Sequence, residues 1–129
     1  MPKIKILLVD DEKSLCRVLK LNLEETGRYE VQTESKGTNA LNAALAFKPD
    51  LIVLDFIMPD MDGGDVLQQM EGHPLLRHVP VIFLTAVATK EDTQDQGTVI
   101  GGHYVIAKPV SVEQLTEAIE RKLKETGKR

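Results

Sequence analysis

The chain has 129 residues, which fits one domain, and 42% of them are hydrophobic, enough for a single core. Its net charge of −4 argues against nucleic-acid binding through a general basic surface, and its one cysteine, Cys16, excludes an internal disulfide. The apolar run near the N-terminus is too short for a signal peptide or a membrane span. We therefore expect a cytoplasmic protein without membrane insertion.

Five short apolar runs alternate with helical patterns along the chain. The runs cover residues 4–9, 29–33, 51–54, 80–84 and 104–107. Strands that alternate with helices predict right-handed βαβ units, a parallel sheet and a three-layer α/β sandwich. The run at 29–33 alternates apolar and polar residues, as an edge strand does. Gly27 is expected to end the first helix, and Ser111 with Gln114 forms a capping box that begins the last one.

The segment 90–102 fits this pattern poorly. It should hold the fourth helix, but it reads KEDTQDQGTVIGG. It has few apolar anchors, and Gly97 falls in its middle. We expect a short or frayed helix there, because glycine in a helix interior is destabilising.

Polar side chains follow four of the five apolar runs. Asp10 and Asp11 follow the first, Asp55 the third, Thr85 the fourth and Lys108 the fifth. A single such residue at a strand end is more often a helix cap or a solvated loop residue. However, the carboxyl ends of parallel strands share one edge of the sheet, where open α/β sheets bind their ligands. The joint pattern therefore predicts that three carboxylates, a hydroxyl and an ammonium group converge.

This set of groups suits phosphoryl chemistry on a carboxylate. Three clustered carboxylates repel one another, and a divalent cation removes that repulsion. All-oxygen ligands suit Mg²⁺, which keeps several waters and binds phosphate. A phosphoryl group between the metal, Lys108 and the Thr85 hydroxyl would have its oxygens matched. Asp55, alone at the end of the central strand, is the best nucleophile, whereas the adjacent Asp10 and Asp11 suit the metal.

The motifs LLVDDE, LIVLDFIMPDMDGGDVL, VIFLTA and AKP, in this order, resemble the receiver domains of bacterial response regulators. The resemblance runs from residue 4 to about residue 124 and implies a flavodoxin-like (βα)5 fold with a five-stranded parallel sheet of order 2-1-3-4-5. It implies a signalling domain and not an enzyme, one that catalyses only its own phosphorylation and slow dephosphorylation. The phosphoryl donor would be a sensor histidine kinase or a phosphotransfer protein. Phosphorylation would change the conformation and so signal to a downstream protein partner that the sequence does not identify.

The resemblance also implies which residues hold the metal. Asp55 would be the phosphoacceptor, and Asp10 and Asp11 would be the acidic pair. Mg²⁺ would be bound by these three carboxylates and by the backbone carbonyl of Ile57.

The remaining family positions include one departure. Thr85 would be the switch hydroxyl, and Lys108 would contact the phosphate, oriented by a cis Lys108–Pro109 bond. The family usually places an aromatic residue three positions before this lysine, where the chain has Val105, while Tyr104 comes one residue earlier. Side chains alternate along a strand, so Tyr104 should face solvent or a neighbouring helix unless a bulge shifts the strand by one residue.

We expect residues 1–125 to form the receiver domain and residues 126–129 a short basic tail. No segment typical of a DNA-binding or catalytic output domain occurs, so the chain is either a natural single-domain protein or an excised domain. Two other functions compete with phosphoryl acceptance. The first is a receiver that has lost its chemistry, which the intact set of site residues argues against. The second is a phosphatase with an aspartyl intermediate, which needs a second acid where this chain has Ile57.

Overall fold

The strands form one six-stranded sheet of order β2-β1-β3-β4-β6-β5. The computed structural model describes residues 2–86 and 103–127, and the backbone of residues 98–100. The elements in chain order are β1 (Ile4–Val9), α1 (Lys13–Glu25), β2 (Tyr29–Glu34), the short 3₁₀ helix η1 (Gly37–Asn39), α2 (Ala40–Phe47), β3 (Leu51–Asp55), α3 (Gly63–Glu71), β4 (Val81–Thr85), β5 (Thr98–Ile100), β6 (His103–Ala107) and α5 (Val112–Glu125).

Five of the six strands confirm the predicted parallel sheet. Strands β2, β1, β3, β4 and β6 are parallel and follow the predicted order 2-1-3-4-5, with β6 as the fifth strand of that series. The sixth strand, β5, pairs antiparallel with β6 at the edge of the sheet and was not predicted.

The expectation of a helix over 90–102 is wrong for residues 98–100, which form β5. All three residues there are β-branched, which favours extended backbone, and β6 offers a backbone edge for them to pair with. The rest of that segment lies outside the described residues.

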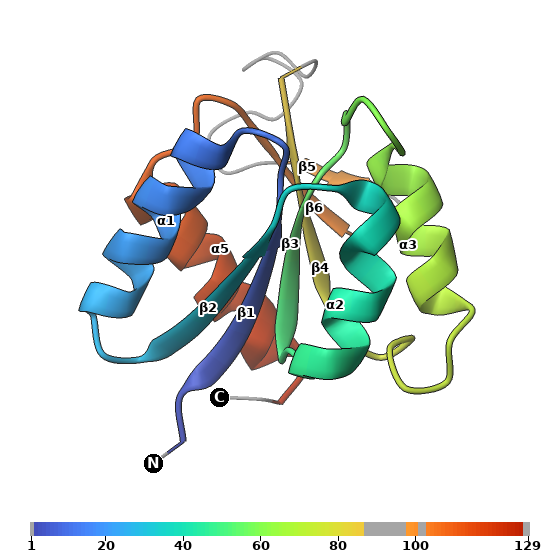
Figure 1. Cartoon of the computed structure of the whole chain (residues 1–129). Helices are drawn as coiled ribbons and strands as arrows, with labels where there is room; N and C mark the ends of the chain where they lie inside the picture. The colour runs from blue at the N-terminus through green and yellow to red at the C-terminus, as the bar shows by residue number, and fades with distance from the viewer. Residues whose placement is uncertain (1, 87–97, 101–102, 128–129) are drawn as a thin grey trace.

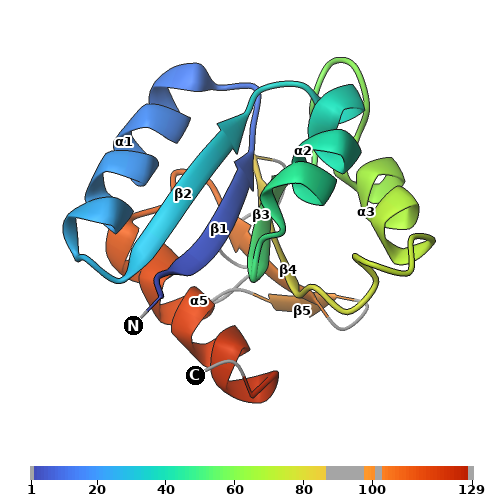
Figure 2. The ribbon, with the colours of Figure 1, turned by 60° about the horizontal axis from the view of Figure 1, so that its bottom comes forward.

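Helices cover both faces of the sheet, as Figures 1 and 2 show, with α1 and α5 on one face and α2 and α3 on the other. Along β1, Ile6 and Leu8 pack toward α1 and α5, whereas Leu7 and Val9 pack toward α2 and α3. All four side chains are fully buried. This alternation explains why the inner strands read as unbroken apolar runs: each is buried on both faces. The three-layer α/β sandwich is therefore confirmed.

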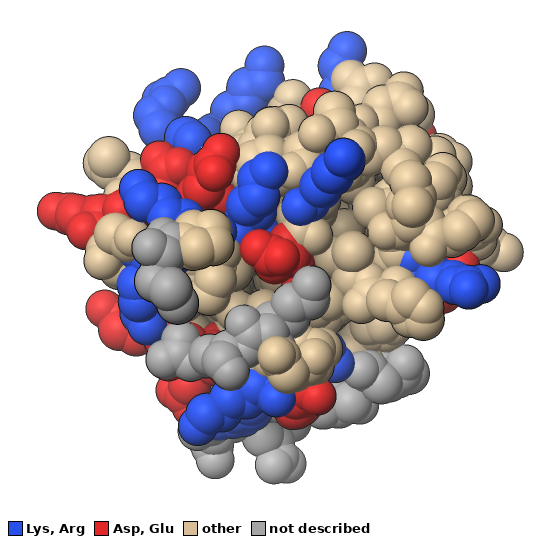
Figure 3. All heavy atoms as spheres, turned by 90° about the horizontal axis from the view of Figure 1, so that it is seen from below, with Lys and Arg blue, Asp and Glu red and all other residues tan. Residues whose placement is uncertain are grey.

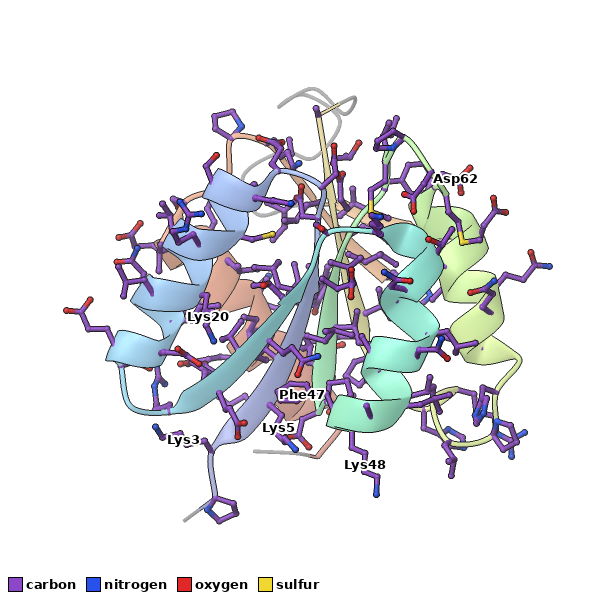
Figure 4. The ribbon with its side chains drawn as sticks, viewed as in Figure 1. Lys3, Lys5, Lys20, Phe47, Lys48 and Asp62 are labelled. Atoms are coloured by element: carbon purple, nitrogen blue, oxygen red, sulfur yellow. The ribbon has the colours of Figure 1, made fainter. Side chains whose placement is uncertain are left out.

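Strand β2 is the edge strand that the sequence predicted, and side chains of α1 cover part of its free edge. The Val31 N–H donates to Glu24 Oε2 at 3.0 Å, and the Val31 carbonyl accepts from Lys20 Nζ. Lys20 and Glu24 also pair with each other at 3.1 Å. Figure 4 labels Lys20, which extends from α1. Open strand edges invite pairing with another chain, so this ion pair protects the centre of the β2 edge.

The predicted helix boundaries agree with the backbone. Gly27, at φ +80°, follows the end of α1 in the left-handed conformation that favours glycine. Ser111 caps α5 through its hydroxyl, which accepts from the Gln114 N–H at 3.0 Å, and the Gln114 side chain accepts in return from the Ser111 N–H. Within the described residues, no helix is long and apolar enough to cross a membrane.

The two ends of the parallel strands lie on opposite sides of the molecule. The five parallel strands run from the end of the sheet near the N-terminus, at the bottom of Figure 1, to the upper end, where β1, β3, β4 and β6 terminate. Seen from below, the molecule carries basic and acidic side chains interspersed with one another (Figure 3). The residues expected to perform the chemistry all belong to the opposite, upper edge.

Candidate functional site

Four neighbouring strands bring the predicted site residues to the same edge of the sheet. Asp10 directly follows β1, Asp55 is the last residue of β3, and Thr85 is the last residue of β4. Lys108 directly follows β6, and its N–H donates to the Thr85 carbonyl at 2.8 Å. Since these strands are adjacent and parallel, residues separated by up to 98 positions in sequence (10 to 108) share one site.

The three acids form a compact cluster. One carboxylate oxygen from each of Asp10, Asp11 and Asp55 lies within 4.8 Å of the other two. Asp10 is fully buried and Asp55 is 2% exposed, whereas Asp11 is exposed. Burial and the charge of Asp10 raise the pKa of Asp55 to about 6. The cluster therefore holds negative charge at a cost that a cation would remove.

Lys108 supplies one positive charge to this cluster. Its Nζ lies 2.9 Å from Asp10 Oδ2, 2.6 Å from Glu12 Oε1 and 3.4 Å from Asp55 Oδ2. Burial opposes the charged form of Lys108, but the hydrogen bond to Glu12 and the interaction with the Asp10 carboxylate outweigh it and hold the pKa of Lys108 above its ordinary value. The ammonium group stays charged beside the expected phosphoacceptor. The Lys108–Pro109 bond is cis, as the family resemblance implied.

Glu12 is a site residue that the sequence analysis missed. Its carboxylate makes the shortest of the three Lys108 contacts. The only signal in the sequence was its place as the third acid of the run Asp10-Asp11-Glu12. Its side chain is about half exposed, so the pair with Lys108 lies at the mouth of the cluster.

The loop after β3 is fixed next to Asp55 by its own backbone. The Ile57 N–H donates to Asp55 Oδ1 at 3.2 Å, and the Gly63 N–H donates to the Phe56 carbonyl at 2.7 Å. A Cβ atom on Gly63 would lie 2.7 Å from the Asp55 carbonyl oxygen, so only glycine permits this approach. The loop therefore closes on itself immediately after Asp55.

The cluster fits a hard divalent cation. It offers oxygen atoms alone, and Mg²⁺ typically takes one or two carboxylates and keeps several waters. The buried Asp10 Oδ2 accepts no hydrogen bond from the described residues, although Lys108 Nζ forms an ion pair with it. A buried carboxylate oxygen that faces a positive charge, next to two further acids, is consistent with a cation ligand.

Tyr104 faces away from Val105, as expected from the alternation along the strand. Its hydroxyl donates to Glu125 of α5, and Lys122 Nζ lies 5.2 Å from its ring centre. Val105 packs on the other face of the sheet, with the core under α2 and α3. The pairing of β6 with β4 runs without interruption through Tyr104 and Val105, so no bulge shifts the strand at these two residues.

Comparison with known proteins agrees with this geometry. A family model described as the response regulator receiver domain matches residues 6–120. The chain belongs to this family. Receiver domains are signalling domains that accept a phosphoryl group on an aspartate from histidine kinases.

Relatives of this receiver domain include full-length regulators. The alkaline phosphatase synthesis transcriptional regulatory protein PhoP of Bacillus subtilis is 39% identical over 118 residues, which are 90% of this chain and 47% of PhoP. The dual master transcriptional regulator RpaA of Synechocystis is 32% identical over 124 residues, or 96% of this chain and 51% of RpaA. This receiver thus spans about half the length of these curated relatives.

Solved receiver structures superimpose along almost the whole chain. A CheY-like receiver domain protein from Methanospirillum hungatei has a TM-score of 0.81 at 30% identity, covering 98% of both chains. The chemotaxis response regulator CheY4 of Vibrio cholerae has a TM-score of 0.78 at 28% identity, covering 93% of this chain and 98% of CheY4. The flavodoxin-like fold of this receiver is therefore shared with known response regulators.

Proposed function

We propose that Asp55 is the phosphoacceptor and that phosphorylation depends on Mg²⁺ held by Asp10, Asp11, Asp55 and the backbone carbonyl of Ile57. The observation that carries this proposal is the place of Asp55: its carboxylate is buried in the acid cluster, and Oδ2 lies 3.4 Å from the Lys108 ammonium. Neither Asp10 nor Asp11 lies at the end of the central strand, since both follow β1.

The phosphoryl donor would be a phosphohistidine on a sensor histidine kinase or a phosphotransfer protein. A carboxylate oxygen of Asp55 attacks phosphorus, the P–N bond breaks, and the imidazole leaves with a proton from solvent or from its own protein. A bound Mg²⁺ would neutralise charge on the phosphoryl oxygens. Lys108 contributes a fixed positive charge to the same oxygens, and Thr85, buried at the end of β4, would donate its hydroxyl to one of them.

The acyl phosphate should be hydrolysed slowly. In the family, the side chain two residues beyond the phosphoacceptor flanks the phosphoryl group, and here it is Ile57. This side chain is about half exposed and apolar, so it can neither orient nor activate an attacking water. We therefore propose that the only reactions this domain catalyses are its own phosphorylation and slow dephosphorylation.

The output would be a change of conformation read by a downstream protein partner. Thr85 lies between the Asp55 strand and the Lys108 strand, so movement of its hydroxyl toward the phosphoryl group would alter the end of β4. Tyr104 is tied to α5, and we propose that it takes no part in the switch. Residues 1–125 would form the signalling domain, in agreement with the end of α5 at Glu125, and residues 126–129 a basic tail. A histidine-kinase partner would place this domain in the cytoplasm.

Incubation with Mg²⁺ and acetyl phosphate, followed by intact mass measurement, tests the proposal. The wild-type protein should gain one phosphoryl group, and Asp55→Asn, which keeps the shape but removes the nucleophile, should gain none. A wild-type protein without an adduct would favour a receiver that has lost its chemistry. Rapid consumption of acetyl phosphate without an adduct would favour the phosphatase. An adduct on Asp55→Asn at the wild-type rate would contradict the assignment.

A further inference from the structure

A second carboxylate in the loop after β3, that of Asp60, ties this loop to the segment before α2. Asp60 Oδ1 accepts from the Gly37 N–H at 3.2 Å. Asp60 Oδ2 accepts from both the N–H and the hydroxyl of Thr38, at 3.1 and 3.0 Å. These bonds, led by the one from the Thr38 backbone, hold the pKa of Asp60 below its ordinary value. The carboxylate is therefore charged, and both of its oxygens accept hydrogen bonds in this contact.

The contact works as a helix cap supplied from another part of the chain. Gly37 and Thr38 begin η1, which leads directly into α2, and the first N–H groups of a helical segment have no partner within it. An anionic oxygen acceptor satisfies such donors and is favoured at a helix start. Capping residues normally sit at the start of their own helix, whereas Asp60 lies 22 residues beyond Thr38. The cap therefore fixes one loop against another.

The two segments also approach too closely for any residue but glycine at position 37. A Cβ atom on Gly37 would lie 2.9 Å from the Met61 carbonyl oxygen and 3.2 Å from the Met58 side chain. Met58 is itself buried, in the core on the side of α2 and α3. The middle of the loop is thus held both by the hydrogen bonds of Asp60 and by the close approach of Met58 and Met61 to Gly37.

This loop carries the group expected to bind the metal. Its beginning is fixed by the Gly63 N–H to the Phe56 carbonyl, and its end by Asp62, which caps α3 and is labelled in Figure 4. Ile57 lies between the closed base of the loop and the Asp60 contact. Asp60 and Thr38 also border an open hollow of about 390 Å³ that Asp11 lines from the β1 side. The Asp60 contact and one acid of the cluster, Asp11, therefore line the same hollow.

We propose that Asp60 is a positioning residue for the magnesium site. Through Gly37 and Thr38 it holds the loop so that the Ile57 carbonyl and the Asp55 carboxylate keep their places relative to Asp11. Asp60 would not touch the metal, because it is not among the three acids whose oxygens cluster and both of its own oxygens already accept hydrogen bonds. This inference rests on the proposed Mg²⁺-dependent function and adds to it a residue outside the acid cluster.

The test compares Mg²⁺ affinity in matched variants by titration calorimetry, with Mg²⁺ alone as the ligand. Asp60→Asn removes the charge and puts an amide donor against the Thr38 donors, and Thr38→Val removes one of the three bonds. Thr38→Ser keeps all three hydrogen bonds to Asp60 and should therefore bind Mg²⁺ with wild-type affinity. Asp50→Asn is the control, because Asp50 Oδ2 also accepts a backbone N–H, from Lys5 at 2.9 Å, but at the opposite edge of the sheet. Lys5 appears near the bottom of Figure 4.

Asp60→Asn should weaken Mg²⁺ binding by up to about tenfold, the lower end of the effect of losing a direct partner of a metal ligand, because Asp60 acts on the ligands only through the loop. Thr38→Val should weaken it less, and Asp50→Asn should leave it unchanged even if both aspartate variants lose stability. The Mg²⁺ concentration needed for half-maximal phosphorylation by acetyl phosphate should rise in parallel in Asp60→Asn.

Two results would overturn this inference while leaving the proposed function intact. One is an Asp60→Asn variant that binds Mg²⁺ as tightly as the wild type. The other is an Asp50→Asn variant that loses as much Mg²⁺ affinity as Asp60→Asn, which would reveal a general effect of destabilisation. A wild-type protein that binds no Mg²⁺ would instead overturn the proposed function together with this inference. The wild-type titration, measured first, distinguishes the two failures.

Discussion

The Asp55→Asn substitution should stabilise the metal-free protein at neutral pH. Asp55 is almost fully buried next to the buried Asp10, and burial together with the charge of Asp10 raises its pKa from 3.8 to about 6. Lys108 offsets only part of this effect. The folded protein therefore holds an ionised Asp55 less well than the unfolded chain does.

The sign and size of the effect follow from proton linkage. Between about pH 4 and pH 6 the folded state binds more protons at Asp55 than the unfolded state, so the free energy of unfolding falls as pH rises through this window. Each pH unit between the two pKa values costs about 1.4 kcal/mol, so the full cost at pH 7 is on the order of 3 kcal/mol. Asparagine stays neutral and avoids it, so Asp55→Asn should gain about 2–3 kcal/mol at pH 7.

Urea denaturation in EDTA at pH 4 and pH 7 measures this difference directly. The advantage of Asp55→Asn should be small at pH 4 and large at pH 7. Saturating Mg²⁺ should reduce it, because only the wild-type protein retains the full set of ligands and gains stability from binding. Asp50→Asn, at the opposite edge, should show no such gain. The argument fails if Asp55→Asn is no more stable than the wild type at pH 7 in EDTA, or if its advantage is the same at both pH values.

Three further predictions test the water exclusion, the switch and the sheet edge. Ile57→Asn should speed the decay of the phosphoryl adduct, because a polar side chain can orient water; an unchanged decay rate by intact mass would contradict this. Tyr104→Ala should leave the amide-exchange changes caused by beryllofluoride, an aspartyl-phosphate mimic, in place; their disappearance would assign Tyr104 to the switch. The double variant Lys20→Ala/Glu24→Ala should increase concentration-dependent self-association in light scattering, because it uncovers the Val31 backbone; a mass unchanged from wild type at every concentration would refute that role of the pair.

The sequence predicted those parts of the structure that depend on local patterns. The unbroken apolar runs identified the parallel strands, and the polar residues after them identified the shared edge, because strand direction alone places those ends together. The alternation rule also predicted that Tyr104 faces away from Val105, toward solvent or a neighbouring helix, and in the structure that helix is α5. In each case the periodicity within a single strand or helix determines which way its side chains point.

Other features were missed because they depend on contacts between distant segments. Glu12 reaches Lys108 only after two loops have met, and Asp60 reaches Thr38 only after the loop after β3 packs on η1. Strand β5 forms at residues 98–100 because these three residues find a backbone partner in β6, which a prediction from local pattern does not include. Such contacts leave no periodic trace in the sequence, so they had to be found in the fold.

The most direct measurement of the central claim locates the phosphoryl group itself. After reaction with acetyl phosphate and Mg²⁺, reduction with borohydride converts an acyl phosphate of aspartate to homoserine, which peptide mass mapping can assign to one position. We predict homoserine at Asp55 alone, in an amount that follows the phosphoryl content, and none when Mg²⁺ is chelated before the donor is added. Homoserine at Asp10 or Asp11, or an unmodified Asp55 peptide in a protein that carries the phosphoryl mass, would contradict the account.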